Sequence, residues 1–209
     1  MPMGATVAGI ILAGGQSKRM GRDKSLLPLP GAAHTTFIAH LATLLSKQCR
    51  EVIVVARDAV QAANFTILSA TPSMRVVIDQ QPGVGPLMGI YSGLSALCTT
   101  TTHALVIAVD TPFIQPALLA FLLTQVPDDD TTLLVPLVEG APQVLHAIYP
   151  RTLLPIIAER LHAGKCGPRA LLDMVPVRYI DEALLRQHDP QLQSFINLNT
   201  PEEFAAYQE

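Results

Sequence analysis

Four short apolar runs in the first half of this 209-residue sequence constrain its fold more than any other feature. They read VAGIIL at 7–12, EVIVVAR at 51–57, RVVID at 75–79 and HALVIAVD at 103–110. The runs are rich in β-branched residues and do not alternate polar with apolar residues. This pattern is typical of strands that are covered on both faces. The sequence therefore predicts a central sheet buried between two layers.

Helical patterns follow most of these runs. Apolar residues repeat at helical spacing from Phe37 to Leu45, and two further helices have Pro86 and Pro116 in their first turns. The order of strand, loop and helix predicts an α/β fold with three layers and a doubly wound, mostly parallel sheet. We find no internal repeat, low-complexity segment or linker, so we expect a single domain over 1–209.

The second half of the chain has a different pattern. The runs TLLVPLV and QVLHAIY flank EGAP, which predicts a small antiparallel element. We expect helices at about 151–163 and 168–174, a strand near VRYID and a last helix from Pro201.

Composition excludes several classes of function. The chain is 49% hydrophobic and 15% charged with a net charge of −3, which suits a large core and argues against bulk binding to nucleic acid. The apolar runs are too short to span a bilayer, and no basic region precedes the first one, so we expect a cytoplasmic protein. The three cysteines form no CxxC pair and are expected to be buried thiols: Cys49, Cys98 and Cys166.

The stretch LAGGQSKRMGRDKSLL at 12–27 concentrates glycine and positive charge directly after the first apolar run. A glycine-rich turn between a strand and a helix presents backbone N–H groups that bind phosphate. Five residues separate Gly15 from Gly21, so the spacing is not that of a P-loop, and the adjacent pair Gly14–Gly15 excludes GxGxxG. The alternative is a tight turn with solvated basic residues. The clustered charge favours a polyphosphate site over that alternative.

Two aspartates follow predicted strands. Asp110 ends the run at 103–110, at the sheet edge where open α/β folds bind ligands. Because magnesium prefers a few carboxylates together with phosphates and water, Asp110 is the best metal candidate. A helix cap or turn role is the alternative for Asp110. Asp79 ends the run at 75–79, and it would contact ribose, nucleotide or metal-bound water, or would serve the loop alone.

Two further motifs bear on a ligand site. Gly85, Pro86, Leu87 and Gly89 form G-P-L-x-G, where small residues would let a base or ribose approach the backbone, or would pack a helix start on a strand. Asn197 and Asn199 alternate on a predicted extended segment, so both amides would face one ligand. The alternative is that Asn199 or Thr200 caps the last helix.

The whole pattern resembles a known family. The motif L-A-G-G-x-S-x-R-M-G-x-D-K at 12–24 is similar to the nucleotide-binding signature of the molybdenum cofactor guanylyltransferases, which are MobA-like nucleotidyltransferases. The resemblance continues in DQQPGVGPLMGIYSGL (79–94), VDTPF (109–113) and INLNTPEEF (196–204), so it spans essentially the whole chain. It implies a Rossmann-like nucleotidyltransferase fold.

The resemblance also implies roles for the motif residues. The aspartate of its D-x-P motif, here Asp110, would hold Mg²⁺, Asp79 would lie in the nucleotide site, and the N-x-N motif would lie on the pterin side. On this reading Arg19 and Lys24 offset phosphate charge and act with Asp110 in catalysis. The expected nucleotide-binding residues are Leu12, Ala13, Gly14, Gly15, Lys24, Asp79, Gly85, Pro86, Leu87 and Asp110, and the expected acceptor-binding residues are Asn197 and Asn199.

The expected reaction transfers GMP from GTP to molybdopterin and releases pyrophosphate. A transient contact with molybdoenzymes or their chaperones is also expected. One residue departs from the family pattern: Val55 stands where we expect an asparagine near the guanine. Transfer of CMP from CTP and transfer to another phosphorylated acceptor therefore stay open. A nucleotide-binding accessory protein without catalysis is the alternative from another class.

Overall fold

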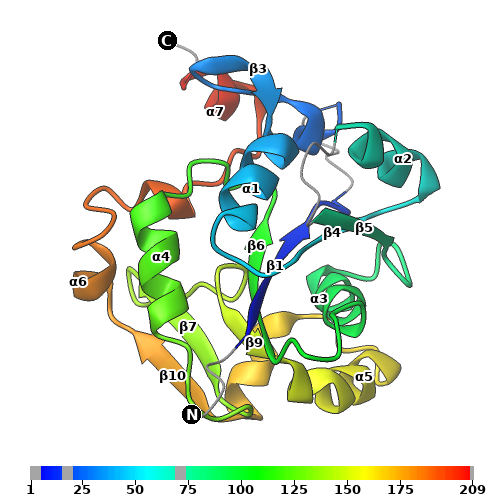
Figure 1. The fold of residues 1–209 in the computed structure, drawn as a ribbon, viewed down its shortest axis with the longest axis vertical. Coiled ribbons are helices and arrows are strands. Elements are labelled where there is room, and N and C mark those ends of the chain that lie inside the picture. The colour runs from blue at the N-terminus through cyan, green and yellow to red at the C-terminus, as the bar shows by residue number, and fades with distance from the viewer. Residues whose placement is uncertain (1–5, 16–20, 69–73, 208–209) are drawn as a thin grey trace.

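The computed structural model describes residues 6–15, 21–68 and 74–207. Its centre is a sheet in the order β10-β7-β9-β6-β1-β4-β5, with β8 paired to β7 (Figure 1). Strands β1, β4, β5 and β6 are parallel neighbours and correspond to the four apolar runs: β1 (Val7–Leu12), β4 (Val52–Ala56), β5 (Met74–Ile78) and β6 (His103–Ala108). The predicted mostly parallel sheet is confirmed.

The second half of the chain extends the sheet beyond β6. Strand β9 (Ile148–Pro150) runs antiparallel to both β6 and β7 (Leu133–Val138), whereas β10 (Val177–Ile180) is parallel to β7. The turn at 139–140 connects β7 to the short antiparallel β8 (Ala141–Pro142). These pairings confirm the predicted antiparallel element.

Side chains of the central strands alternate between two apolar layers. Ile11 packs in the layer that contains α1 (Phe37–Ser46) and α4 (Pro116–Thr124), together with residues of α2 (Ala59–Leu68), α6 (Glu182–Leu185) and α7 (Pro201–Ala205). Ile10 faces the opposite layer, which contains α3 (Pro86–Ser95), α5 (Leu154–His162) and the 3-10 helix η3 (Pro168–Asp173). Figure 1 shows α1 and α3 on opposite sides of the strands. Helices on both faces explain why the strand sequences lack alternation.

Some elements differ from the expectations. The segment 168–174 forms η3 rather than an α-helix, and α5 begins after a 3-10 turn, η2 (Arg151–Leu153). Helix α2 and the hairpin of β2 (Pro28–Leu29) with β3 (Ala32–Thr36) were not predicted. Strand β6 ends at Ala108, so Asp110 lies in the following turn.

The cysteine prediction is correct for one residue of three. Cys49 is buried, but Cys98 is exposed and Cys166 is half-buried, and all three are free thiols. Cys98 and Cys166 lie in connecting segments outside the helices and strands, where a small apolar side chain is not forced into the core. No helix in the described ranges is long and apolar enough to cross a bilayer.

A buried carboxylate joins the sheet to the loop between α3 and β6. Glu51 is 7% exposed and accepts hydrogen bonds from Thr101 Oγ1 (2.7 Å), the Cys98 N–H (2.9 Å) and Arg75 (2.6 Å). Burial alone would raise the pKa of this carboxyl group. The hydrogen bonds outweigh that effect and lower the pKa to about 2. Glu51 is therefore a stabilising anion at neutral pH.

We expect Glu51→Gln to lower the free energy of unfolding at neutral pH by about 3 kcal/mol, the linkage energy of such a pKa shift. Because the folded pKa lies below the unfolded one, this contribution is full above the unfolded pKa of 4.5 and is lost as the pH falls toward 2. Urea unfolding at several pH values measures it, with the exposed Glu159→Gln as control. A gap between variant and wild type that does not shrink in acid would contradict the assignment.

Candidate active site

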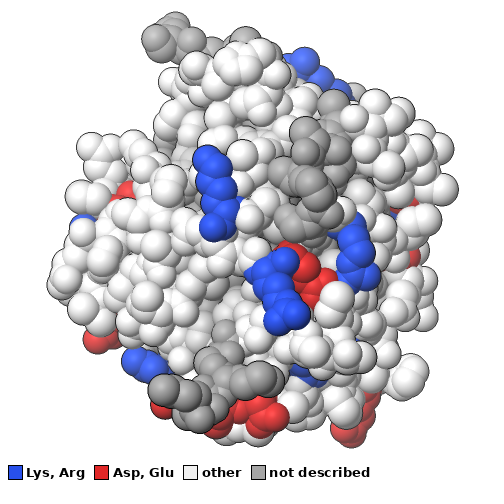
Figure 2. Space-filling model, viewed as in Figure 1, with Lys and Arg blue, Asp and Glu red and all other residues white. Residues whose placement is uncertain are grey.

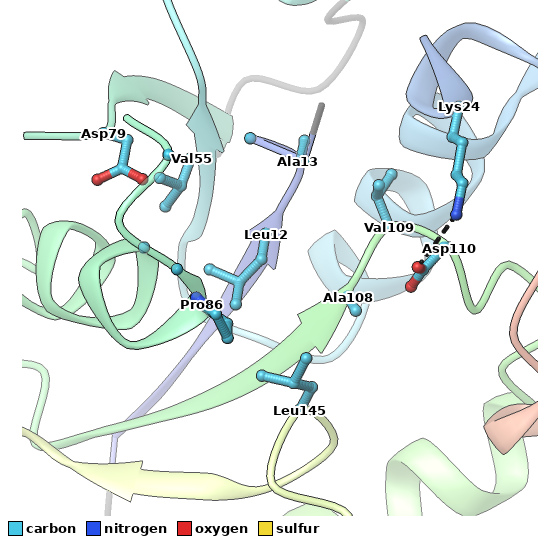
Figure 3. A pocket seen from close by; sticks show the side chains of 15 residues that line it. Leu12, Ala13, Lys24, Val55, Asp79, Pro86, Ala108, Val109, Asp110 and Leu145 are labelled. Carbon is cyan, nitrogen blue, oxygen red and sulfur yellow. Dashed lines mark hydrogen bonds and ion pairs between the residues drawn. The ribbon is translucent and has the colours of Figure 1, made fainter. Parts of the chain in front are cut away.

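A cavity of about 470 Å³ opens at the carboxyl ends of the central strands (Figure 3). Leu12, Val55 and Ala108 are register partners across β1, β4 and β6, and all three line it. The remaining lining residues come from the loops that follow the strands, from α3 and from the β8–β9 connection: Ala13, Gly14, Gly15, Lys24, Asp79, Gly83, Gly85, Pro86, Gly89, Val109, Asp110 and Leu145.

One end of the cavity carries paired charges. The Lys24 Nζ lies 3.5 Å from Asp110 Oδ2 and donates a 2.7 Å hydrogen bond to Asn199 Oδ1. The two side chains of the ion pair are 12% and 27% exposed, respectively, so the pair is shielded but reachable from the cavity. Figure 3 shows Lys24 directed toward Asp110, with Asp79 and Val55 at the other end. A cation and an anion at one edge suit a ligand that carries both phosphate and a metal ion.

Two backbone hydrogen bonds fix Asp110. The Val109 N–H donates to Leu12 O at 3.1 Å, and the Leu198 N–H donates to Asp110 O at 2.8 Å. Thr111 Oγ1 lies 2.9 Å from His146 Nε2 and 2.8 Å from Ala108 O, to which it donates. His146 is buried, which lowers its pKa to about 4 and leaves the imidazole neutral at pH 7. The turn that carries Asp110 is therefore held by hydrogen bonds on both sides of this residue.

The other end of the cavity is mostly apolar. Val55 is 1% exposed, and the Ala13 N–H donates to its backbone oxygen at 3.0 Å. Gly89 lies close to Leu12: an added Cβ would come within 3.2 Å of Leu12 Cδ2. Gly85, the N-cap residue directly before α3, has φ +130°, a conformation that residues with side chains rarely adopt. Glycine is thus required where α3 meets the cavity.

Asp79 is the charged residue that the described part of the chain places at the apolar end. Its side chain is buried, and Oδ1 accepts hydrogen bonds from Ser92 Oγ (3.0 Å) and the Gln81 N–H (3.4 Å). Burial is the largest effect and raises the pKa of Asp79 despite these hydrogen bonds. The charged form of Asp79 is therefore costly in the folded protein.

The other predicted residues are distributed as follows. Leu87 is fully buried in the core beside the cavity and does not line it. Asn199 accepts from Lys24, whereas Asn197 is exposed, with its amide 3.5 Å from Phe195 O. Thr200 caps α7 through a capping box with Glu203. Arg19 lies outside the described residues.

Part of the cavity lining was not predicted from the sequence. Val109 and Ala108 adjoin Asp110 in one motif, so a search centred on that motif would have included them. Leu145 gives no such signal, because its approach depends on how β9 returns beside β6. Figure 2 shows basic side chains next to acidic ones near the centre of the view, within a largely uncharged surface.

We expect Asp79→Asn to keep or slightly raise the free energy of unfolding at neutral pH, because the amide removes a buried charge and keeps the acceptor oxygen. The folded pKa is raised, so wild type loses stability relative to this variant as the pH rises through that pKa. Denaturant unfolding at several pH values tests this. As the contrasting control, Asp58→Asn should destabilise, because hydrogen bonds lower the pKa of Asp58. A clear loss of stability in Asp79→Asn would show that its charge serves the fold.

Known proteins are similar to this chain over most of its length. The family model of the MobA-like NTP transferase domain matches residues 9–183. A probable molybdenum cofactor guanylyltransferase of Chloroflexus aggregans is 37% identical over 214 residues, covering 100% of this chain and 96% of that protein. A molybdenum cofactor guanylyltransferase of Desulfosudis oleivorans is 32% identical over 94% of this chain and 92% of its own length.

A solved structure is similar over the same extent. The molybdopterin-guanine dinucleotide biosynthesis protein A of Archaeoglobus fulgidus superimposes with a TM-score of 0.81 at 25% identity, covering 96% of each chain. The family model matches the chain from β1 through β10. All residues that line the cavity lie within this range, whereas Asn199, which accepts a hydrogen bond from Lys24, lies beyond it. The chain belongs to the MobA-like NTP transferase family.

Proposed function

We propose that this protein transfers GMP from GTP to molybdopterin and releases pyrophosphate, which forms molybdopterin guanine dinucleotide. One observation carries the proposal: Lys24 and Asp110 form an ion pair beside a glycine-rich turn, at one end of a cavity large enough for a nucleotide. The relatives named as guanylyltransferases support the choice of GTP and molybdopterin. The product would then pass to a molybdoenzyme or its chaperone.

Lys24 would bind the triphosphate. Its ammonium group is held between Asp110, in the turn after β6, and Asn199, just before α7. Negative phosphate oxygens would replace part of this contact, while the backbone of Leu12 to Gly15 would hold the nucleotide. Arg19 would add a second positive charge. Such groups stabilise charge that grows on the leaving pyrophosphate.

The donor set fits magnesium. No group of three His, Cys, Asp or Glu among the described residues could hold a metal ion by itself. Asp110 offers a carboxylate on the cavity, with Asp79 across it, and magnesium commonly takes one or two carboxylates with the remaining positions filled by phosphate and water. Asp110 would hold the ion. When bound, magnesium supplies further neutralisation of the triphosphate charge.

The chemistry needs positioning more than a protein nucleophile. An oxygen of the acceptor's terminal phosphate attacks the α-phosphorus of GTP, and the bond from that phosphorus to the bridging oxygen breaks, so pyrophosphate leaves with the electron pair. The acceptor phosphate is already largely ionised near neutral pH, so no strong general base is needed. The chain contributes by aligning both phosphates and by offsetting their charge.

The base would lie at the apolar end, between Leu12, Val55 and Pro86. The side chain of Val55 cannot hydrogen-bond, so base selection would depend on backbone groups and on Asp79. A carboxylate accepts hydrogen bonds well from the two adjacent donors of guanine. Because Val55 replaces the expected asparagine, transfer of CMP from CTP is the second candidate.

A panel of ATP, GTP, CTP and UTP with molybdopterin and magnesium tests the proposal by pyrophosphate release. We expect GTP to give a kcat/KM at least about tenfold above the other nucleotides, which corresponds to roughly 1.4 kcal/mol of discrimination. A preference for CTP would replace guanylyl by cytidylyl transfer. Nucleotide binding without pyrophosphate release from any of the four would support the accessory protein instead.

We expect Lys24→Ala to lower kcat/KM by about 10²–10³-fold, because a preorganised charge opposite the leaving group is lost. The variant should stay folded, and the exposed Lys47→Ala is the matched control. Arg19→Ala should act in the same direction. Asp110→Asn should raise the magnesium concentration needed for half-maximal rate. Wild-type turnover in Lys24→Ala, or unchanged magnesium dependence in Asp110→Asn, would remove that residue from its role.

A further inference from the structure

Gln61 is a buried polar residue that the proposed function does not use. It lies in the first turn of α2 and is 2% exposed. Its own N–H donates to Asp58 Oδ1 at 2.8 Å, which fixes the start of the helix. A buried amide side chain is costly unless its hydrogen bonds are made, so the partners of Gln61 indicate what it does.

The Gln61 side chain joins three segments. Its Oε1 accepts from the Arg57 N–H at 2.7 Å, and its Nε2 donates to Ala13 O at 3.1 Å and to Asp23 Oδ2 at 2.5 Å. The reversed amide would place a donor against a donor and an oxygen against two acceptors. The orientation is therefore determined by the partners themselves.

Asp23 connects Gln61 to the short helix that begins at Lys24. Its Oδ1 accepts from the Ser25 N–H (3.0 Å) and from Ser25 Oγ (2.5 Å), so Asp23 caps the 3-10 helix η1 (Lys24–Leu26). Ser25 is fully buried. One oxygen of Asp23 thus fixes the short helix that carries Lys24, and the other oxygen is held by Gln61.

Ala13 is the other residue to which the Gln61 amide donates. It follows β1, lines the cavity and adjoins the glycine pair. Arg57 supports the same geometry: it donates to Gly15 O at 3.1 Å and lies 3.8 Å from Asp23 Oδ2. Its side chain is 31% exposed, so the buried amide of Gln61 is the better-shielded link. Gln61 therefore fixes the distance between the backbone of Ala13, which lines the cavity, and η1, which carries Lys24.

We propose that Gln61 is a positioning residue for the transfer reaction: it ties Asp23 to Ala13 and so holds Lys24 in register with the glycine-rich backbone of the cavity. This inference rests on the proposed function for its effect on rate. Its structural part, the placement of η1, stands independently of any turnover.

Gln61→Glu is the sharpest test, because it keeps the size and places a carboxylate against Asp23 Oδ2 and Ala13 O. Gln61→Met removes the hydrogen bonds without adding charge. We expect both variants to lower kcat/KM for pyrophosphate release by about 10–100-fold, the usual effect of small misplacements. The fall should lie mainly in kcat, since Lys24 acts most strongly on the transition state. Gln187→Glu, at an exposed turn position, is the matched control and should behave as wild type.

Hydrogen exchange provides a readout that needs no activity. The N–H groups of Ser25, Leu26 and Leu27 donate to Asp23 or Lys24, so a peptide covering 24–29 reports on η1. Faster exchange there in both Gln61 variants, with β1, β4 and β6 unchanged, would support the positioning role. Exchange and turnover as in wild type would overturn it, and so would equally faster exchange throughout the sheet. If wild type released no pyrophosphate with any nucleotide, the proposed function would fail while the exchange result still decided the placement of η1.

Discussion

Burial of β1, β4 and β6 on both faces determines where this protein keeps its polar chemistry. Ile10 and Ile11 point into opposite apolar layers, and their register partners on β4 and β6 do the same. A charged side chain within these strands would lie in one of the two layers at a large cost. Polar groups therefore collect where the strands end, and parallel strands end along a shared edge. The cavity, the glycine pair and Asp110 all follow from that constraint.

The charged end of the cavity also depends on the last part of the chain. The Leu198 N–H donates to Asp110 O, and Asn199 accepts from Lys24, so one short segment contacts both members of the ion pair. This segment lies beyond residues 9–183, which the family model matches. Thr200 and Glu203 then cap α7, and Phe204 packs in the core against Phe37. Core packing of this terminal helix thus contributes to the placement of Lys24.

The sequence predicted the elements that have a strong periodic signal. Strand β1 has the predicted limits, and β4, β5 and β6 differ from the predicted runs by one or two residues. Helix α2 was missed because its apolar residues form no stripe: Phe65 is buried, whereas Val60 and Ile67 are exposed. The positions of Asp79 and Asp110 on one cavity followed from their place after parallel strands. The proposed role of Gln61 could not be predicted from the sequence. It depends on contacts with Ala13 and Asp23, which lie 48 and 38 positions earlier in the chain.

Phosphate binding and base selection differ in how far they can be inferred from sequence, for a physical reason. The charged end of the cavity, where we propose that the phosphates bind, combines side-chain charge with a glycine-rich turn, and both leave a visible pattern between residues 12 and 24. The apolar end, where we propose that the base binds, is lined by Val55, by Pro86 and Gly89 of α3 and by the buried Asp79. Backbone groups are the same for every sequence, so their contribution to specificity depends only on how the chain is placed. Here Gly89 and Gly93 allow α3 to approach β1 closely, because an added Cβ would come within 3.2 Å of Leu12 Cδ2 and 2.7 Å of Ile10 Cγ2, respectively. In the proposed function, the nucleotide preference would therefore depend more on this close approach than on the side chain at position 55.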